Sequence, residues 1–151
     1  KKTRVRKADS DGGDRLSFDF DASDFLNRLN RTEYGAEQAA VRAMEDNTDD
    51  LARIAQNIAP IDKATLRRGM QKKVKLSRDR LIGEVSFRAV EDGFNYAIWT
   101  HEADYNLGPT SSQAGGTDGY TVGNKYLERP LKGEAEKYIR NVAEAVREEL
   151  R

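Results

Sequence analysis

The hydrophobic pattern of this chain changes its period twice, and this change limits the possible folds more than any other feature. Over residues 34–59, apolar side chains recur every three or four positions, which predicts an amphipathic helix. Over residues 74–87 they alternate with polar ones, as in strands. The helical spacing returns over residues 131–150. The order of helix, antiparallel strands and helix predicts an α+β fold.

Local signals place the boundaries of these elements. Pro60 is expected to end the first helix, because its ring removes a backbone donor and restricts the residue before it. The polar residues 77–80 predict a hairpin turn, and the aromatic and β-branched run over residues 94–101 predicts a third strand. Residues 16–20 alternate as in a short strand, and Ser23 is expected to cap a brief helix.

The length of 151 residues suits one domain. We expect a mobile basic and acidic arm over residues 1–15, then a single domain over residues 16–151. In this domain a long N-terminal helix and a C-terminal helix pack on a small antiparallel β-sheet. Residues 103–124 are rich in Gly and lack apolar rhythm, which predicts a long mobile loop of functional importance. No apolar run is long enough for a membrane span, so no membrane association is expected.

The charges of the chain are segregated, although 26 basic and 26 acidic residues give a formal net charge of zero. Residues 1–7 contain only basic charges, residues 45–50 contain four acids, and residues 63–80 contain eight bases and one acid. Opposite patches can orient docking between copies, although a solvated surface is the alternative. The basic residues that we expect to face DNA or an acidic partner are Lys63, Arg67, Arg68, Lys72, Lys73 and Lys75.

No motif in the chain predicts catalysis or a cofactor. Cys is absent, which excludes disulfides and thiolate metal sites. His101, the only His, precedes Glu102, but the pair lacks the spacing of known metal sites, and ordinary hydrogen bonds are favoured. A calcium-loop pattern that begins at Asp9 has Phe20 where a bidentate Glu is required. The Gly-rich residues 115–123 lack the Lys-Ser/Thr of a phosphate loop. We therefore predict a protein that is not an enzyme and binds no metal or cofactor.

Three short segments occur between and beside the predicted helices in a fixed order. They are Ala59-Pro60-Ile61-Asp62 with Leu66-Arg67, Tyr96-Ala97 with His101-Glu102, and Tyr126-Leu127 with Pro130-Leu131. In this order the chain resembles the tail-completion, or head–tail joining, family of neck proteins in tailed bacteriophages, over about residues 34–150. One departure is Lys63-Ala64, which stands where the family usually has Thr-Gly. If that Gly adopts a positive φ, the turn must differ here.

The resemblance implies a structural role in the virion, at the head–tail junction, after assembly in the cytoplasm of the bacterial host. The family forms a ring, expected to be hexameric, that docks to head adaptor or stopper proteins and to tail terminator or tail-tube proteins. Genomic DNA passes through it without sequence recognition. A non-specific nucleic-acid-binding module and a minor capsid protein of the same fold are the alternative functions. The residues that we expect at partner or subunit interfaces are Trp99, His101, Glu102, Tyr105, Tyr120 and Tyr126. For Trp99, core packing is the alternative.

Overall fold

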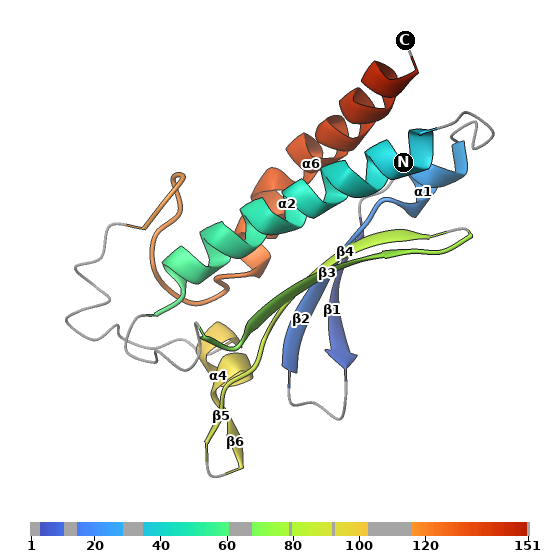
Figure 1. The fold of residues 1–151 in the computed structure, drawn as a ribbon. Coiled ribbons are helices and arrows are strands. Elements are labelled where there is room, and N and C mark those ends of the chain that lie inside the picture. Colours follow the sequence, from blue (N-terminus) through green and yellow to red (C-terminus); the bar gives the residue numbers. More distant parts are fainter. Residues whose placement is uncertain are drawn as a thin grey trace.

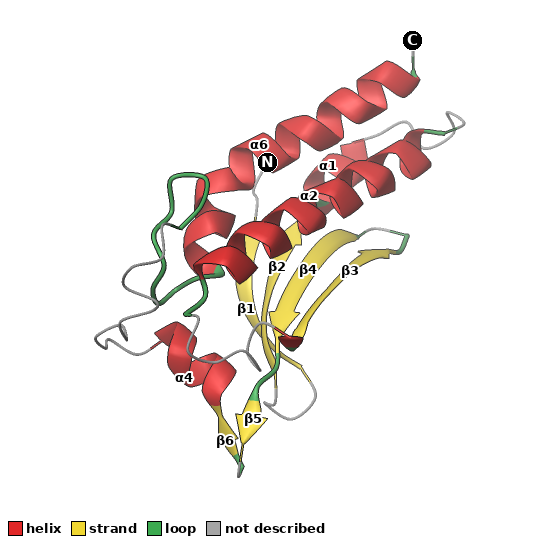
Figure 2. Ribbon diagram, turned by 60° about the vertical axis from the view of Figure 1, so that its left-hand side comes forward, coloured by secondary structure: helices red, strands yellow, loops and turns green. Residues whose placement is uncertain are grey.

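The computed structural model describes residues 4–10, 15–28, 35–60, 68–78, 80–91, 93–102 and 116–150. It has an α+β fold, as the sequence predicts. Two long helices, α2 (Ala36–Ile58) and α6 (Glu128–Glu149), run in opposite directions and lie on the same side of an antiparallel sheet (Figures 1 and 2). This arrangement places the hydrophobic core between the helices and the sheet.

Within the described residues, the sheet has four strands in the order β1-β2-β4-β3. Their bounds are Arg4–Ser10 for β1, Arg15–Asp21 for β2, Met70–Leu76 for β3 and Leu81–Phe87 for β4. Phe18 on β2 is in register with Val85 on β4, and Val85 with Lys72 on β3. The central strand β4 is buried along its whole length. The predicted hairpin and the predicted strand over residues 16–20 are both confirmed.

The N-terminal segment differs from the prediction of a mobile arm. Residues Arg4–Ser10 form the edge strand β1, which pairs with β2 along its length. The segment shows no clear alternation of apolar and polar residues. Edge strands are held by backbone hydrogen bonds on one side only, so they need little from their side chains. The pattern of apolar and polar residues therefore does not indicate this strand.

The short helix α1 (Ser23–Arg28) is present, but Ser23 does not cap it in the predicted way. Ser23 is the first helical residue, and its N–H donates to Asp21 Oδ1 at 2.8 Å. The Asp21 carboxylate thus takes the capping role, which suits an acidic group at a helix N-terminus. The Ser23 hydroxyl instead accepts the N–H of Leu81 at 3.1 Å, which ties α1 to the start of β4.

Helix α2 matches the predicted helix closely and ends where Pro60 requires. Ala59 has extended backbone angles, with φ −66° and ψ 143°. Helix α2 packs closely against strand β4 at Gly83. A Cβ at this position would lie 2.7 Å from Thr48 Cγ2 and 2.9 Å from Met44 Sδ. Gly83 therefore allows the close contact between α2 and β4.

Helix α6 covers the sheet beside α2 and is also as predicted. The rings of Phe20 and Tyr138 meet edge to face with centroids 5.8 Å apart. Between the helices, Asn47 is buried; its Nδ2 donates to the carbonyl of Tyr138 at 2.9 Å, and its Oδ1 accepts from Asn141 Nδ2 at 3.0 Å. This polar pair fixes the register of α2 against α6.

The predicted third strand over residues 94–101 is wrong. Its start forms the short strand β6 (Phe94–Asn95), paired with β5 (Val90–Glu91), and the rest forms helix α4 (Tyr96–Glu102). Aromatic and β-branched residues favour strands only weakly when tertiary contacts oppose them. Here the buried residues Ala97, Thr100 and His101 are three and four positions apart, which is the spacing of one helix face.

Candidate interaction site

Strands β5 and β6 and helix α4 form a small unit at one end of the molecule. It projects beyond the four-stranded sheet, as Figure 1 shows. Gly93, with φ 78°, occupies the turn between β5 and β6. The unit therefore places α4 and its side chains at the margin of the fold.

Two large aromatic side chains of this unit are exposed. Trp99 on α4 has 46% of its surface exposed and Phe94 on β6 has 45%. Their ring centroids lie 6.5 Å apart. We call these two residues the aromatic patch. Core packing, the alternative for Trp99, is wrong in this structure, and an interface role for it stays a prediction.

His101 lies on the opposite, buried side of α4 and links this helix to α6. Its side chain is fully buried and lies between the rings of Phe18 and Tyr126, at centroid distances of 5.1 Å and 5.0 Å. Nε2 accepts the N–H of Glu128, the first residue of α6, at 3.2 Å. Leu127, the N-cap residue of α6, makes no side-chain cap. His101 thus caps α6 from 27 positions away.

The hydrogen bonds of His101 define its protonation state. Because Nε2 accepts from a backbone N–H, the single proton of a neutral ring is on Nδ1, which donates to Glu102 Oε2 at 2.7 Å. Burial lowers the pKa of His101, and Lys125 acts in the same direction, while Glu102 and Glu128 oppose it. The net decrease favours the neutral ring that the geometry requires.

Further contacts hold α4 in place. The Tyr126 hydroxyl, which is buried, donates to the carbonyl of Ala97 at 3.0 Å. Lys125 donates its N–H to the His101 carbonyl at 2.8 Å and pairs through Nζ with Glu102. The predicted interface roles of His101 and Tyr126 are therefore corrected, because both side chains are buried inside the chain. Glu102 is partly buried and contacts both His101 and Lys125, so it is part of the same link between α4 and α6.

Tyr120 lies in a turn that packs against α6, near the C-terminal end of the predicted long loop; residues 103–115 of that loop lie outside the described residues. Thr117 and Tyr120 form an isolated β-bridge, and the Tyr120 hydroxyl donates to Glu134 Oε2 at 2.9 Å. A Cβ at Gly133 would lie only 1.9 Å from the Tyr120 hydroxyl. The aromatic ring thus uses the space that Gly133 leaves on α6. Tyr120 is half-buried within the chain, which differs from the open contact residue that we expected.

An ion-pair network fastens this turn to α2. Arg53 Nη2 lies 2.8 Å from both Asp50 and Asp118, and the Tyr138 hydroxyl donates to Asp50 at 2.8 Å. The Arg53 guanidinium lowers the pKa of Asp118 to about 2. Burial raises the pKa of Tyr120 to about 12 and that of Tyr138 further. Burial alone would raise the pKa of Asp50, but hydrogen bonds from Arg53 and Tyr138 outweigh it.

The predicted basic residues are only partly described. Lys72 pairs with Asp49 at 2.6 Å, and Lys73 and Lys75 lie 3.5 Å and 3.8 Å from Glu84. Lys72 is on the helix-facing side of β3, because its register partner is Val85, whereas Lys73 and Lys75 alternate to the other side. The structure therefore does not gather these lysines on one face. Arg68 is exposed, and Lys63, Arg67 and Tyr105 lie outside the described residues.

No group of three or more His, Asp or Glu side chains in the described ranges could hold a metal ion. In the same part of the chain, no helix is long and apolar enough to cross a bilayer.

Sequence reasoning missed two features of the site. Phe94 was expected on a strand face, although the turn residues 91–93 just before it are a signal for an exposed hairpin tip. The link between Asp50, Arg53 and Asp118 was also missed. The spacing of Asp50 and Arg53 indicates a helix-surface pair, but nothing in the sequence indicates the third member.

Comparisons with known proteins give no relative. No protein-family model, curated protein or solved structure matches this chain.

Proposed function

We propose that this chain is a structural protein at the head–tail junction of a tailed bacteriophage. It assembles with copies of itself into a ring and docks to head adaptor or stopper proteins and to tail terminator or tail-tube proteins. The sequence resemblance suggests this class, and the aromatic patch is the observation that carries the docking role. Exposed aromatic side chains are typical anchors of protein interfaces.

The patch offers substantial docking free energy. A buried aromatic side chain removes about 150–250 Å² from water, and nearly half of the surfaces of Phe94 and Trp99 is still exposed. At about 25 cal/mol per Å², covering both rings contributes about 4 kcal/mol. This is a gross contribution, from which the cost of association is subtracted before it appears as affinity. A partner that covers the aromatic patch therefore gains free energy from apolar burial at this end of the fold.

The link between α4 and α6 prepares the patch for binding. His101, Tyr126 and Lys125 hold the backbone of α4, so Trp99 is presented on a helix with a defined position. A partner then loses less conformational entropy on binding than it would with a mobile loop.

The experiment is complementation of a phage that lacks the gene for this chain. We expect the double variant F94A/W99A to leave heads and tails unjoined in electron micrographs, while circular dichroism shows a folded protein. The control is Leu150→Ala, which removes a 44% exposed apolar side chain from the C-terminal end of α6. Wild-type joining by a folded double variant would refute the docking role.

The alternative of nucleic-acid binding has less support. Lys72, Lys73 and Lys75 pair with carboxylates of the chain, which reduces the charge available to phosphates. A titration of duplex DNA with increasing salt tests it, because a DNA-binding module would show steep salt dependence. A minor capsid protein of the same fold would be labelled by antibodies on the shell of the particle, not at its neck.

A further inference from the structure

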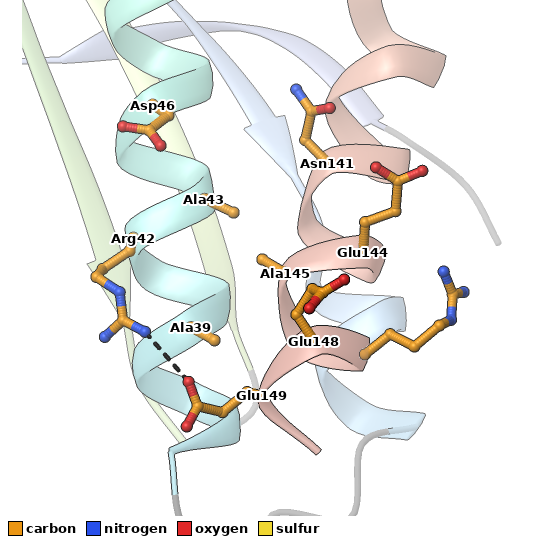
Figure 3. A pocket seen from close by; sticks show the side chains of 10 residues that line it. Ala39, Arg42, Ala43, Asp46, Asn141, Glu144, Ala145, Glu148 and Glu149 are labelled. Atoms are coloured by element: carbon orange, nitrogen blue, oxygen red, sulfur yellow. Dashed lines mark hydrogen bonds and ion pairs between the residues drawn. The ribbon is translucent and has the colours of Figure 1, made fainter. Parts of the chain in front are cut away.

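A groove of about 800 Å³ lies between α2 and α6 near the C-terminal end of α6, away from the aromatic patch. Ala39 and Ala43 point from α2 toward Ala145 on α6, as Figure 3 shows. Because these side chains end at Cβ, the two helices leave space between them. Arg42 Nη2 and Glu149 Oε1, 3.5 Å apart, bridge the groove on one side.

The groove is acidic. Its charged lining residues are four acids and two bases, namely Asp46, Glu144, Glu148, Glu149, Arg42 and Arg147. Asp46 on α2 and Glu144 on α6 form no ion pair with any residue that the structure describes. Two carboxylates on opposite sides of the groove are thus available to a cationic partner.

The described residues of the turn between β3 and β4 are exposed and include Arg78 and Arg80; Asp79, the acid between them in the sequence, lies outside the described residues. The turn is closed by a hydrogen bond from the N–H of Ser77 to the carbonyl of Arg80, at 2.9 Å. Arg80 is exposed and has no ion pair within the described ranges. On the adjoining strand, Lys73 and Lys75 share the single carboxylate of Glu84. Over residues 73–84, four bases stand against two acids, Asp79 and Glu84, so this part of the hairpin has a formal net charge of +2 although its lysines are paired.

We infer that the α2–α6 groove of one copy receives the β3–β4 turn of a second copy. The charges are complementary, and the two surfaces belong to the same chain. Strands β3 and β4, which carry the turn, lie on one side of α2 and α6 lies on the other, so the turn of the same copy is on the other side of α2 from the groove (Figure 2). The contact joins two different patches and is heterologous, so it repeats from copy to copy and can close a ring.

This inference deepens the proposed function, on which its setting in a neck ring rests. It predicts a weak, salt-dependent contact between two copies of the chain. Exposed charge pairs contribute little each, and salt screens them. Its test therefore uses purified protein only, so that a failure here is separate from a failure of head–tail joining.

The experiment is analytical ultracentrifugation of the full chain at low salt over a range of concentrations. We expect wild-type protein to self-associate at high concentration and to dissociate as salt rises. The variants are Glu144→Arg, which reverses a groove charge, and Arg80→Glu, which reverses a turn charge. Each alone is expected to weaken self-association about tenfold. The control Glu136→Arg makes the same change on α6 outside the groove and is expected to associate like wild type.

The decisive measurement is the mixture of Glu144→Arg with Arg80→Glu. The reversed groove then meets a reversed turn, and the two remaining native surfaces also match, so association is expected to return toward the wild-type level. Three results would each overturn the inference: a wild-type protein that stays monomeric at the highest concentration, reversals that behave like Glu136→Arg, or a mixture that associates no better than its components. Circular dichroism confirms that each variant is folded.

Discussion

Lowering the pH from 7.5 to 5.5 should destabilise this protein through one residue, His101. Its Nε2 accepts the N–H of Glu128, so a proton on Nε2 would place a donor against a donor. Burial lowers the pKa of His101 in the folded chain below 6.5, its ordinary value. The folded state therefore binds this proton less readily than the unfolded state.

The sign and size follow from linkage. Above the unfolded pKa, His101 is neutral in both states and its contribution to stability is fully present. As the pH falls through about 6.5 toward the folded pKa, the unfolded chain binds a proton that the folded chain excludes, and the free energy of unfolding falls. Each pH unit with one proton of difference amounts to about 1.4 kcal/mol. Between pH 7.5 and 5.5 the expected loss is therefore up to about 1.4 kcal/mol, since the unfolded His titrates over this interval.

The assay is urea denaturation followed by circular dichroism at several pH values, for wild type and His101→Gln. Because His101 is the only His, the variant should lose this pH dependence while other groups titrate as before. If His101→Gln does not fold, the His101 ring can be titrated directly by NMR in the wild-type protein. Parallel pH profiles for the two proteins, or a measured pKa at or above 6.5, would refute the reasoning.

Two further perturbations test the packing around the helices. Gly133→Ala should displace the Tyr120 hydroxyl from Glu134 and so lower the pKa of Tyr120 from about 12 toward 10. NMR titration of labelled Tyr measures this pKa. Gly123→Ala is the control, because its Cβ would lie 3.7 Å from Arg129, which is an ordinary contact distance. Asn47→Ala should cost about 1–3 kcal/mol of unfolding free energy, because it removes two hydrogen bonds at a buried site. Urea denaturation measures this loss, and an effect no larger than that of the exposed control Gln38→Ala would contradict it.

The elements that the sequence predicts well are those whose side chains follow one period over many residues. Helices α2 and α6 and the β3–β4 hairpin bury one face each, so the core imposes the pattern that the sequence displays. Strand β1 lies at the edge of the sheet, where pairing comes from the backbone, and it leaves no such pattern. The sequence predicts a strand in place of helix α4 because residues 94–101 are a run of aromatic and β-branched residues, and the buried face of the helix includes the polar Thr100 and His101.

The candidate site was predictable only in part, for a related reason. An exposed Trp99 could be proposed from residue type, because aromatic side chains outside a core are typical of interfaces. The role of His101 depends on Glu128, which is distant in the sequence and contributes only a backbone N–H. Any residue other than Pro could supply that donor, so no side-chain pattern marks it. Contacts of this kind follow from the tertiary fold alone.

The two surfaces that we propose differ in strength, and this difference suggests an order of assembly. The aromatic patch offers about 4 kcal/mol of apolar burial, whereas the groove and the turn depend on exposed charges that salt screens. A copy docked through its aromatic patch is held near its neighbours at a high effective concentration, at which even a weak contact between copies is occupied. The free protein should therefore be monomeric at low concentration in physiological salt and form its ring on a docked partner. A closed ring that persists at micromolar concentration without a partner would contradict this order.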